Sequence, residues 1–148
     1  MTLIVFVCGS NRSRSPMAAA YFARLVRERG LKDIEVASAG LHVKHGETVA
    51  QEAREALRRE GLEPLEIGVT QLLPKLIKRA SLIVCMTPEQ QDRAEDLFIS
   101  AKGKVRPLMS VLHSNRPIAE PPKGDLKRHI ECLETMKEAL EALADVVA

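Results

Sequence analysis

Apolar residues in this chain occur in short, nearly continuous runs that alternate with longer amphipathic stretches. The run TLIVFV at 2–7 is apolar at every position after Thr2, which is typical of a parallel strand buried on both faces. The stretch 46–61 instead places Val49, Ala53 and Leu57 on one face of a helix. The pattern as a whole predicts strands at residues 2–7, 34–40, 81–86 and 104–109, and helices at residues 15–30, 46–61, 72–80, 88–101 and 126–148.

The alternation of strands with helices predicts the fold class. We expect an α/β protein with three layers, in which a four-stranded parallel sheet is flanked by helices on both faces. The sequence has no internal repeat and no linker, so we expect a single domain over residues 1–148. In such sheets ligands bind beyond the carboxyl ends of the strands, and the loop after the first strand is therefore the first place to expect a site.

Composition narrows the classes of function. The formal net charge of +2 is too close to balance to favour nucleic acid or an anionic membrane surface, and the chain has no Trp on which bases could stack. Its apolar runs are far shorter than the ~20 residues needed to cross a bilayer. The three cysteines, Cys8, Cys85 and Cys132, include no CxxC pair, so they indicate neither a disulfide framework nor a zinc site. We expect a cytoplasmic protein with no metal, no cofactor, and no nucleic-acid or membrane partner.

The sequence VCGSNRSRS at 7–15 combines groups that suit phosphate chemistry. Successive backbone N–H groups after Cys8 can form an anion-binding nest, and the start of the following helix adds positive partial charge. Arg14 offers a planar guanidinium that can contact two phosphate oxygens. Because Cys8 faces these dipoles, we expect a thiolate near neutral pH that can attack phosphorus, with Ser15 donating a hydrogen bond to the sulfur. The spacing of Cys, Arg and Ser predicts catalysis rather than a merely buried cysteine.

The segment FVCGSNRSRSPMAAAYF resembles the active-site loop of the low-molecular-weight protein tyrosine phosphatases, whose pattern runs V-C-x-G-N-x-C-R-S-P-M-A-E. The resemblance continues in VASAGLHVKHGE at 36–47, ASLIVCMTPEQ at 80–90 and IAEPPKGD at 118–125, so it covers essentially the whole chain. The positions that match the active-site pattern are Cys8, Asn11, Arg14, Ser15, Pro16, Met17 and Ala18. The fold of that family is a four-stranded parallel sheet flanked by helices, which agrees with the pattern above.

The resemblance implies a role for each matching residue. Cys8 would be the nucleophile that forms a phosphocysteine, Arg14 would bind the phosphate and stabilise the transition state, and Ser15 would favour the thiolate. Asn11, helped by Ser38, would hold the backbone of the loop. Water would then hydrolyse the phosphocysteine without a metal. The implied phosphate-binding residues, which would also hold inorganic phosphate or sulfate, are Gly9, Ser10, Asn11, Arg12, Ser13, Arg14 and Ser15.

Several positions depart from the family pattern. The general acid of the family is an Asp before Pro, whereas Glu120 precedes Pro here, so we expect Glu120 to be the acid and rank Asp125 second. The aromatic walls of the family pocket are missing, which leaves Leu41, His42, Val43 and Pro122 as a possible apolar rim. Arg12 stands where family members that act on phosphoarginine carry Thr. We expect its charge to repel a guanidinium substrate and to favour a more acidic one.

These observations favour a phosphomonoester hydrolase that uses a cysteine nucleophile, with protein phosphotyrosine as the expected substrate. A phosphorylated protein or a small phosphomonoester would be its partner. One alternative is an arsenate reductase of the same fold, which needs resolving thiols near Cys8, and only Cys85 and Cys132 remain to supply them. Another alternative is a phosphate- or phosphopeptide-binding module with weak turnover, which the change to Glu120 and the lost aromatic residues support.

Overall fold

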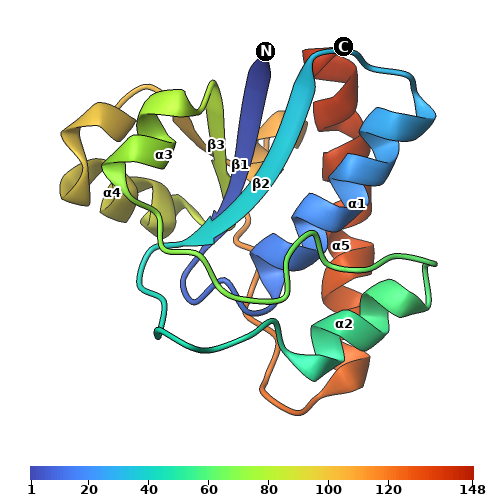
Figure 1. The fold of residues 1–148 in the computed structure, drawn as a ribbon. Coiled ribbons are helices and arrows are strands. Elements are labelled where there is room, and N and C mark those ends of the chain that lie inside the picture. The colour runs from blue at the N-terminus through green and yellow to red at the C-terminus, as the bar shows by residue number, and fades with distance from the viewer.

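The computed structural model describes residues 1–148 (Figure 1) and contains one four-stranded parallel sheet in the order β2-β1-β3-β4. The predicted α/β fold class is confirmed. The strands are β1 (Thr2–Cys8), β2 (Ile34–Gly40), β3 (Leu82–Cys85) and β4 (Val105–Pro107). The helices are α1 (Arg14–Glu28), α2 (Gln51–Arg58), α3 (Pro74–Arg79), α4 (Pro88–Leu97) and α5 (Leu126–Val147), with short 3-10 helices η1 (Ile99–Ala101) and η2 (Leu108–Leu112).

Helices cover both faces of the sheet, as Figure 1 shows, with α1, α2 and α5 on one face and α3 and α4 on the other. The central strand β1 contributes to both cores because successive side chains of a strand point to opposite faces. Ile4 and Phe6 pack toward α1 and α5, and the ring centroids of Phe6 and Phe22 lie 5.3 Å apart. Val5 and Val7 pack toward Ile77 of α3 and Ala94 of α4. This two-sided burial explains the continuous apolar run in the sequence.

Several observed boundaries differ from the predicted ones. Helix α2 begins at Gln51 instead of residue 46, because the preceding backbone is bonded to distant segments. Val49 N donates to Ile67 O and Ala50 N donates to Arg12 O, so neither N–H is available to a helix that starts earlier. The predicted strand at 104–109 contains only three residues of β4, and its end becomes η2. The predicted helix at 88–101 ends at Leu97.

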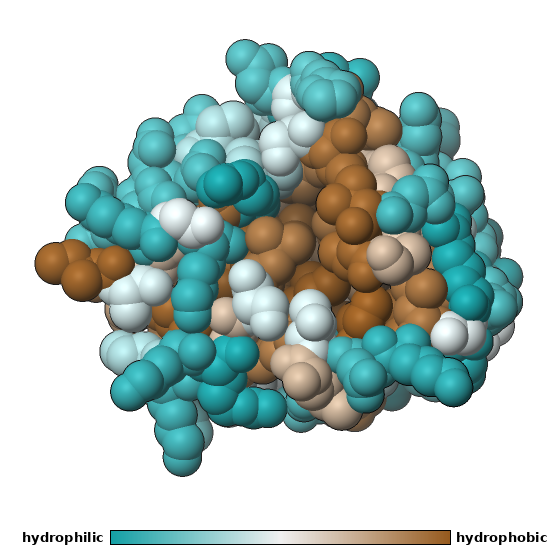
Figure 2. Space-filling view, turned by 90° about the horizontal axis from the view of Figure 1, so that it is seen from above, coloured by the Kyte–Doolittle hydropathy of each residue, from teal (hydrophilic) through white to brown (hydrophobic).

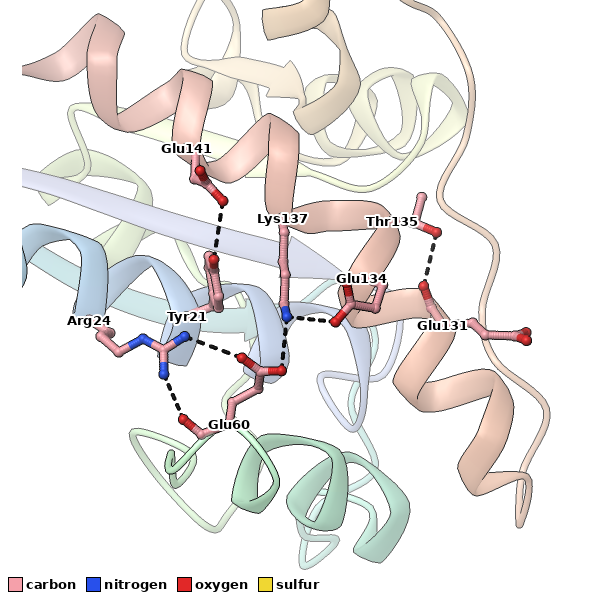
Figure 3. Close-up of polar contacts among 8 residues, drawn as sticks. All are labelled: Tyr21, Arg24, Glu60, Glu131, Glu134, Thr135, Lys137 and Glu141. Carbon is pink, nitrogen blue, oxygen red and sulfur yellow. Dashed lines mark hydrogen bonds and ion pairs between the residues drawn. The ribbon is translucent and has the colours of Figure 1, made fainter.

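A polar cluster fixes α1 and α5 to each other and to the end of α2 (Figure 3). Lys137 Nζ of α5 lies 2.8 Å from Glu60 Oε2, and Arg24 NH2 of α1 lies 3.4 Å from Glu60 Oε1. The hydrogen bond from Lys137 holds the pKa of Glu60 below its usual value. Tyr21 donates to Glu141 Oε2 at 3.2 Å, and burial, together with Glu141, raises the pKa of Tyr21. The helices that carry residues of the candidate site are therefore held in a fixed relative position.

The two chain termini lie at the end of the molecule opposite the loop that follows β1. Figure 2 looks onto this end, where hydrophobic side chains gather in a hollow between hydrophilic rims. None of the helices combines the length and the apolar character needed to cross a bilayer.

Candidate active site

Cys8 ends the central strand β1, so it lies at the carboxyl edge of the sheet where a ligand site is expected. Its side chain is 2% exposed, and Cys8 Sγ lies 3.0 Å from Ser15 Oγ in the first turn of α1. Ser15 Oγ accepts from Asn11 Nδ2 at 2.8 Å and can donate to Ala39 O at 3.3 Å. A hydroxyl carries one proton, which can turn from the carbonyl to the sulfur when the thiolate forms. Ser15 thus lies where the resemblance places a thiolate donor.

Asn11 holds the backbone of the phosphate-binding loop (residues 9–15) through three side-chain contacts. Its φ of 61° is left-handed, a conformation that Asn tolerates better than most residues. Asn11 Nδ2 donates to Ser15 Oγ and to Ser38 Oγ at 3.1 Å, and its Oδ1 accepts from Thr70 N at 2.8 Å. The structure thus places Ser38, the expected supporting residue, in contact with Asn11. Thr70 was not found by sequence reasoning, because a backbone donor distant in the sequence leaves no signal in residue type.

Gly40, at the end of β2, allows the loop to pack closely on the sheet edge. A Cβ at this position would lie 2.7 Å from Gly9 O and 2.7 Å from Val43 Cγ1. Leu41 N and His42 N donate to Cys8 O and Gly9 O, so the start of the loop is also tied to the chain after β2. The close contact with the loop therefore requires a glycine at position 40, the last residue of the SAG sequence at 38–40.

Unpaired donors gather around this loop. Arg14 is 7% exposed, and its NH1 donates to Ile118 O at 2.8 Å while its buried Nε has no protein partner. The backbone N–H groups of Gly9 to Ser13 make no hydrogen bond within the protein. Since buried donors are normally satisfied, a cluster of free N–H groups beside a guanidinium is suited to an anion with several acceptor oxygens. A phosphoryl group is an anion of this kind.

Arg12 is held by the chain that precedes α2. Its Nε donates to Thr48 O at 2.9 Å and lies 3.5 Å from Glu47 Oε2. The charge of Arg12 is therefore compensated by a neighbouring carboxylate, which weakens the expected repulsion of a guanidinium substrate.

A cavity of about 550 Å³ opens beside the phosphate-binding loop, and its walls are mostly polar. Glu120 is exposed and lines this cavity, whereas Asp125 does not line it and caps α5 by accepting from Arg128 N at 3.0 Å. Of the expected apolar rim, Pro122 is the member that lines the cavity. The lining residues are Ser10, Arg12, Ser13, Ala50, Gln51, Glu52, Glu120, Pro121, Pro122, Lys123 and His129.

His129 is a buried residue of this site that sequence reasoning missed. Its Nε2 lies 2.9 Å from Ser13 Oγ, and its Nδ1 lies 2.7 Å from Asp125 O. The signal available in the sequence was helical spacing, because His129 shares the buried face of α5 with Cys132, Leu133 and Met136. A histidine on such an apolar face needs polar partners, which indicates a contact with another element.

The other two cysteines are poorly placed for thiol chemistry. Burial raises the pKa of Cys85 to about 12 and that of Cys132 to about 11. Cys85 is fully buried and its Sγ contacts Thr87 O at 3.3 Å. No group of three or more His, Cys, Asp or Glu side chains is arranged to hold a metal ion.

Residues 3–148 match the model of one protein family, described as low molecular weight phosphotyrosine protein phosphatase. The chain belongs to this family. A protein-arginine-phosphatase of Geobacillus stearothermophilus is 33% identical over 98% of this chain and 93% of its own length. The low molecular weight protein-tyrosine phosphatase A of Mycobacterium tuberculosis is 30% identical over 97% of this chain and 90% of its own length.

A solved structure of a related phosphatase has the same fold as this chain. The YwlE arginine phosphatase, in a mutant whose active-site serine is phosphorylated, superposes with a TM-score of 0.91 at 27% identity, over 97% of this chain and 94% of that chain. The family and the names of these relatives support the predicted activity. The chain is a cysteine-based protein phosphatase, which is a hydrolase.

Proposed function

We propose that Cys8 is the nucleophile of this phosphatase, Arg14 its phosphate-binding cation and Glu120 its general acid. The Cys8 thiolate attacks phosphorus of a phosphorylated side chain and forms a sulfur–phosphorus bond as the bond from phosphorus to the leaving group breaks. The leaving atom takes a proton from the Glu120 carboxyl. Arg14 and the free N–H groups of residues 9–13 bind the phosphoryl oxygens throughout.

The second half of the reaction regenerates the enzyme. Water attacks the phosphocysteine, and the Glu120 carboxylate accepts a proton from that water. The sulfur–phosphorus bond breaks, inorganic phosphate leaves, and Ser15 donates to the returning thiolate across the observed 3.0 Å contact. Inorganic phosphate or sulfate is accordingly a ligand of residues 9–15, without a metal or cofactor.

The observation that carries this proposal is the contact of Cys8 with Ser15 beside an unpartnered, buried Arg14 Nε. A reductase would need a second reactive thiol, and burial raises the pKa of both Cys85 and Cys132. The three cysteines are free, which supports a reducing, cytoplasmic setting for the single domain.

Phosphotyrosine is the substrate expected from the sequence, and phosphoarginine is a second candidate that specific observations favour. The cavity beside the loop offers Glu52 and Glu120 but no Phe, Tyr or Trp side chain. Carboxylates suit a guanidinium, whereas a phosphotyrosine ring gains most from an aromatic wall. Glu47 compensates the charge of Arg12, and one of the relatives described above is named a protein-arginine-phosphatase.

The test is hydrolysis of matched phosphotyrosine and phosphoarginine peptides by the wild type, Cys8→Ser and Glu52→Gln. Loss of all turnover in Cys8→Ser, with phosphate binding retained, supports the nucleophile. A defect of Glu52→Gln confined to the phosphoarginine peptide supports that substrate, and equal rates for wild type and Glu52→Gln on it count against recognition by Glu52. Phosphatase activity that survives in Cys8→Ser would refute the proposal.

A further inference from the structure

His129 links two parts of the site that are far apart in the sequence. It is 1% exposed, and it contacts Ser13 of the phosphate-binding loop through Nε2 and the carbonyl of Asp125 through Nδ1. A carbonyl oxygen only accepts, so Nδ1 carries a proton and donates to Asp125 O. In the neutral imidazole Nε2 then accepts, and the Ser13 hydroxyl donates to it. The carbonyl partner thus fixes the direction of the hydrogen bond from Nδ1, and the hydrogen bond from Ser13 to Nε2 is that of the neutral imidazole.

Through His129, the phosphate-binding loop is attached to one end of the segment that carries the proposed general acid. The acid segment (residues 118–125) begins at Ile118, whose carbonyl accepts from Arg14 at 2.8 Å, and ends at Asp125, whose carbonyl accepts from His129. The phosphate-binding loop thus holds the acid segment at both ends through adjacent residues, Arg14 and Ser13. Glu120 lies between these two attachments.

We propose that His129 is a positioning residue that keeps Glu120 in register with the phosphate-binding loop. Glu120 is exposed, so the place of its carboxyl depends on the backbone that carries it. A general acid contributes about 10²–10⁴-fold, and a displacement of about 1 Å can cost about 100-fold of that. The hydrogen bonds of His129 preserve this contribution by fixing the backbone that carries Glu120. The inference rests on the proposed role of Glu120.

The experiment compares two substrates that differ in their need for an acid. p-Nitrophenyl phosphate has a good leaving group and hardly needs protonation, whereas phenyl phosphate needs it. His129→Leu keeps the bulk and removes both hydrogen bonds. We expect it to lower kcat/KM for phenyl phosphate by about tenfold or more beyond its effect on p-nitrophenyl phosphate, because kcat/KM reports the transfer to Cys8, in which the leaving group is protonated. His129→Gln, whose amide oxygen can still accept from Ser13, should restore most of the phenyl phosphate activity.

Two further variants make the outcome decisive. Ser13→Ala removes the same hydrogen bond without altering α5, so it should show the same selective defect even if His129→Leu folds poorly. In a Glu120→Gln background His129→Leu should have no additional selective effect, because the acid is already lost. Equal losses of kcat/KM on both substrates in folded His129→Leu and Ser13→Ala, or no loss on either, would overturn the proposal. The proposed function fails separately, if Cys8→Ser retains turnover.

Discussion

Gly40→Ala tests how closely the phosphate-binding loop must pack on the sheet edge. The new Cβ would lie 2.7 Å from Gly9 O and 3.0 Å from Asn11 Cβ, where ordinary van der Waals contact begins near 3.4 Å. The close oxygen belongs to the backbone, so no side-chain rotation relieves the overlap. Overpacking of this kind costs about 1–3 kcal/mol. For a domain of this size that loss lowers Tm by about 3–10 °C.

The same displacement should affect catalysis more than stability. Gly9 follows Cys8 directly, and Asn11 holds Ser15 and the loop backbone, so a shift of a few tenths of an ångström misaligns both sulfur and donors. We expect kcat/KM for p-nitrophenyl phosphate to fall by about 10- to 100-fold at a temperature where the variant remains folded. Thermal unfolding followed by circular dichroism and steady-state kinetics measure the two effects.

Gly68→Ala is the matched control, since a Cβ there meets no atom within 4 Å and the backbone is not left-handed. It should change Tm by no more than about 1–2 °C and leave kcat/KM close to the wild-type value. If Gly40→Ala behaves like this control, the loop does not require close packing against position 40.

Three other changes test separate parts of the structure. Ser15→Ala removes the hydroxyl that lies 3.0 Å from Cys8 Sγ. It should lower kcat by about 10- to 100-fold, which corresponds to the free energy of one hydrogen bond to a charged group. An unchanged kcat for p-nitrophenyl phosphate would contradict this role of Ser15. The hydrogen bond from Lys137 lowers the pKa of Glu60 in the folded protein. The pair therefore stabilises the fold at pH values above 4.5, the pKa of Glu60 in the unfolded chain. This stabilisation is lost as the pH falls through the lower pKa that Glu60 has in the folded protein. Urea unfolding should therefore show Lys137→Met to be about 1 kcal/mol less stable at pH 7, with the difference shrinking toward pH 3, and a constant difference would count against the pair. Burial raises the pKa of Cys85 and of Cys132, so iodoacetamide at pH 7 should label neither of these two thiols. Label found on either of them by mass spectrometry would show that burial does not protect them.

The elements predicted from sequence are the ones whose signal is local. The strand β1 is continuous and apolar because both of its faces are covered, and the phosphate-binding loop is contiguous, so their positions follow from neighbouring residues. The start of α2 could not be found in this way. Its preceding residues have a helical pattern, but Arg12 O and Ile67 O bind the backbone N–H groups of Ala50 and Val49.

In the candidate site, too, the residues with a local sequence signal could be predicted and their distant partners could not. The matching residues Cys8, Arg14 and Ser15 lie within eight positions and could be found from the sequence, whereas the partners that hold them come from distant segments. Thr70 supplies a backbone donor and Ile118 a backbone acceptor, and backbone groups carry no residue-specific signal. Long-range contacts of this kind become visible only when the fold brings the segments together.

The attachments of the acid segment bear on the proposed role of Glu120, which stands where the family pattern has an aspartate. Glu120 has one more rotatable bond than an aspartate, so its carboxyl is less well fixed by its own side chain. The segment that carries it is attached to the phosphate-binding loop at both ends, through Arg14 and through Ser13 with His129. A rigid backbone restricts the region that a longer side chain can reach. The serine at position 13, where the family pattern has a cysteine, takes part in one of these attachments through the contact of its hydroxyl with His129. Both departures from the family pattern therefore contribute to the same structural arrangement.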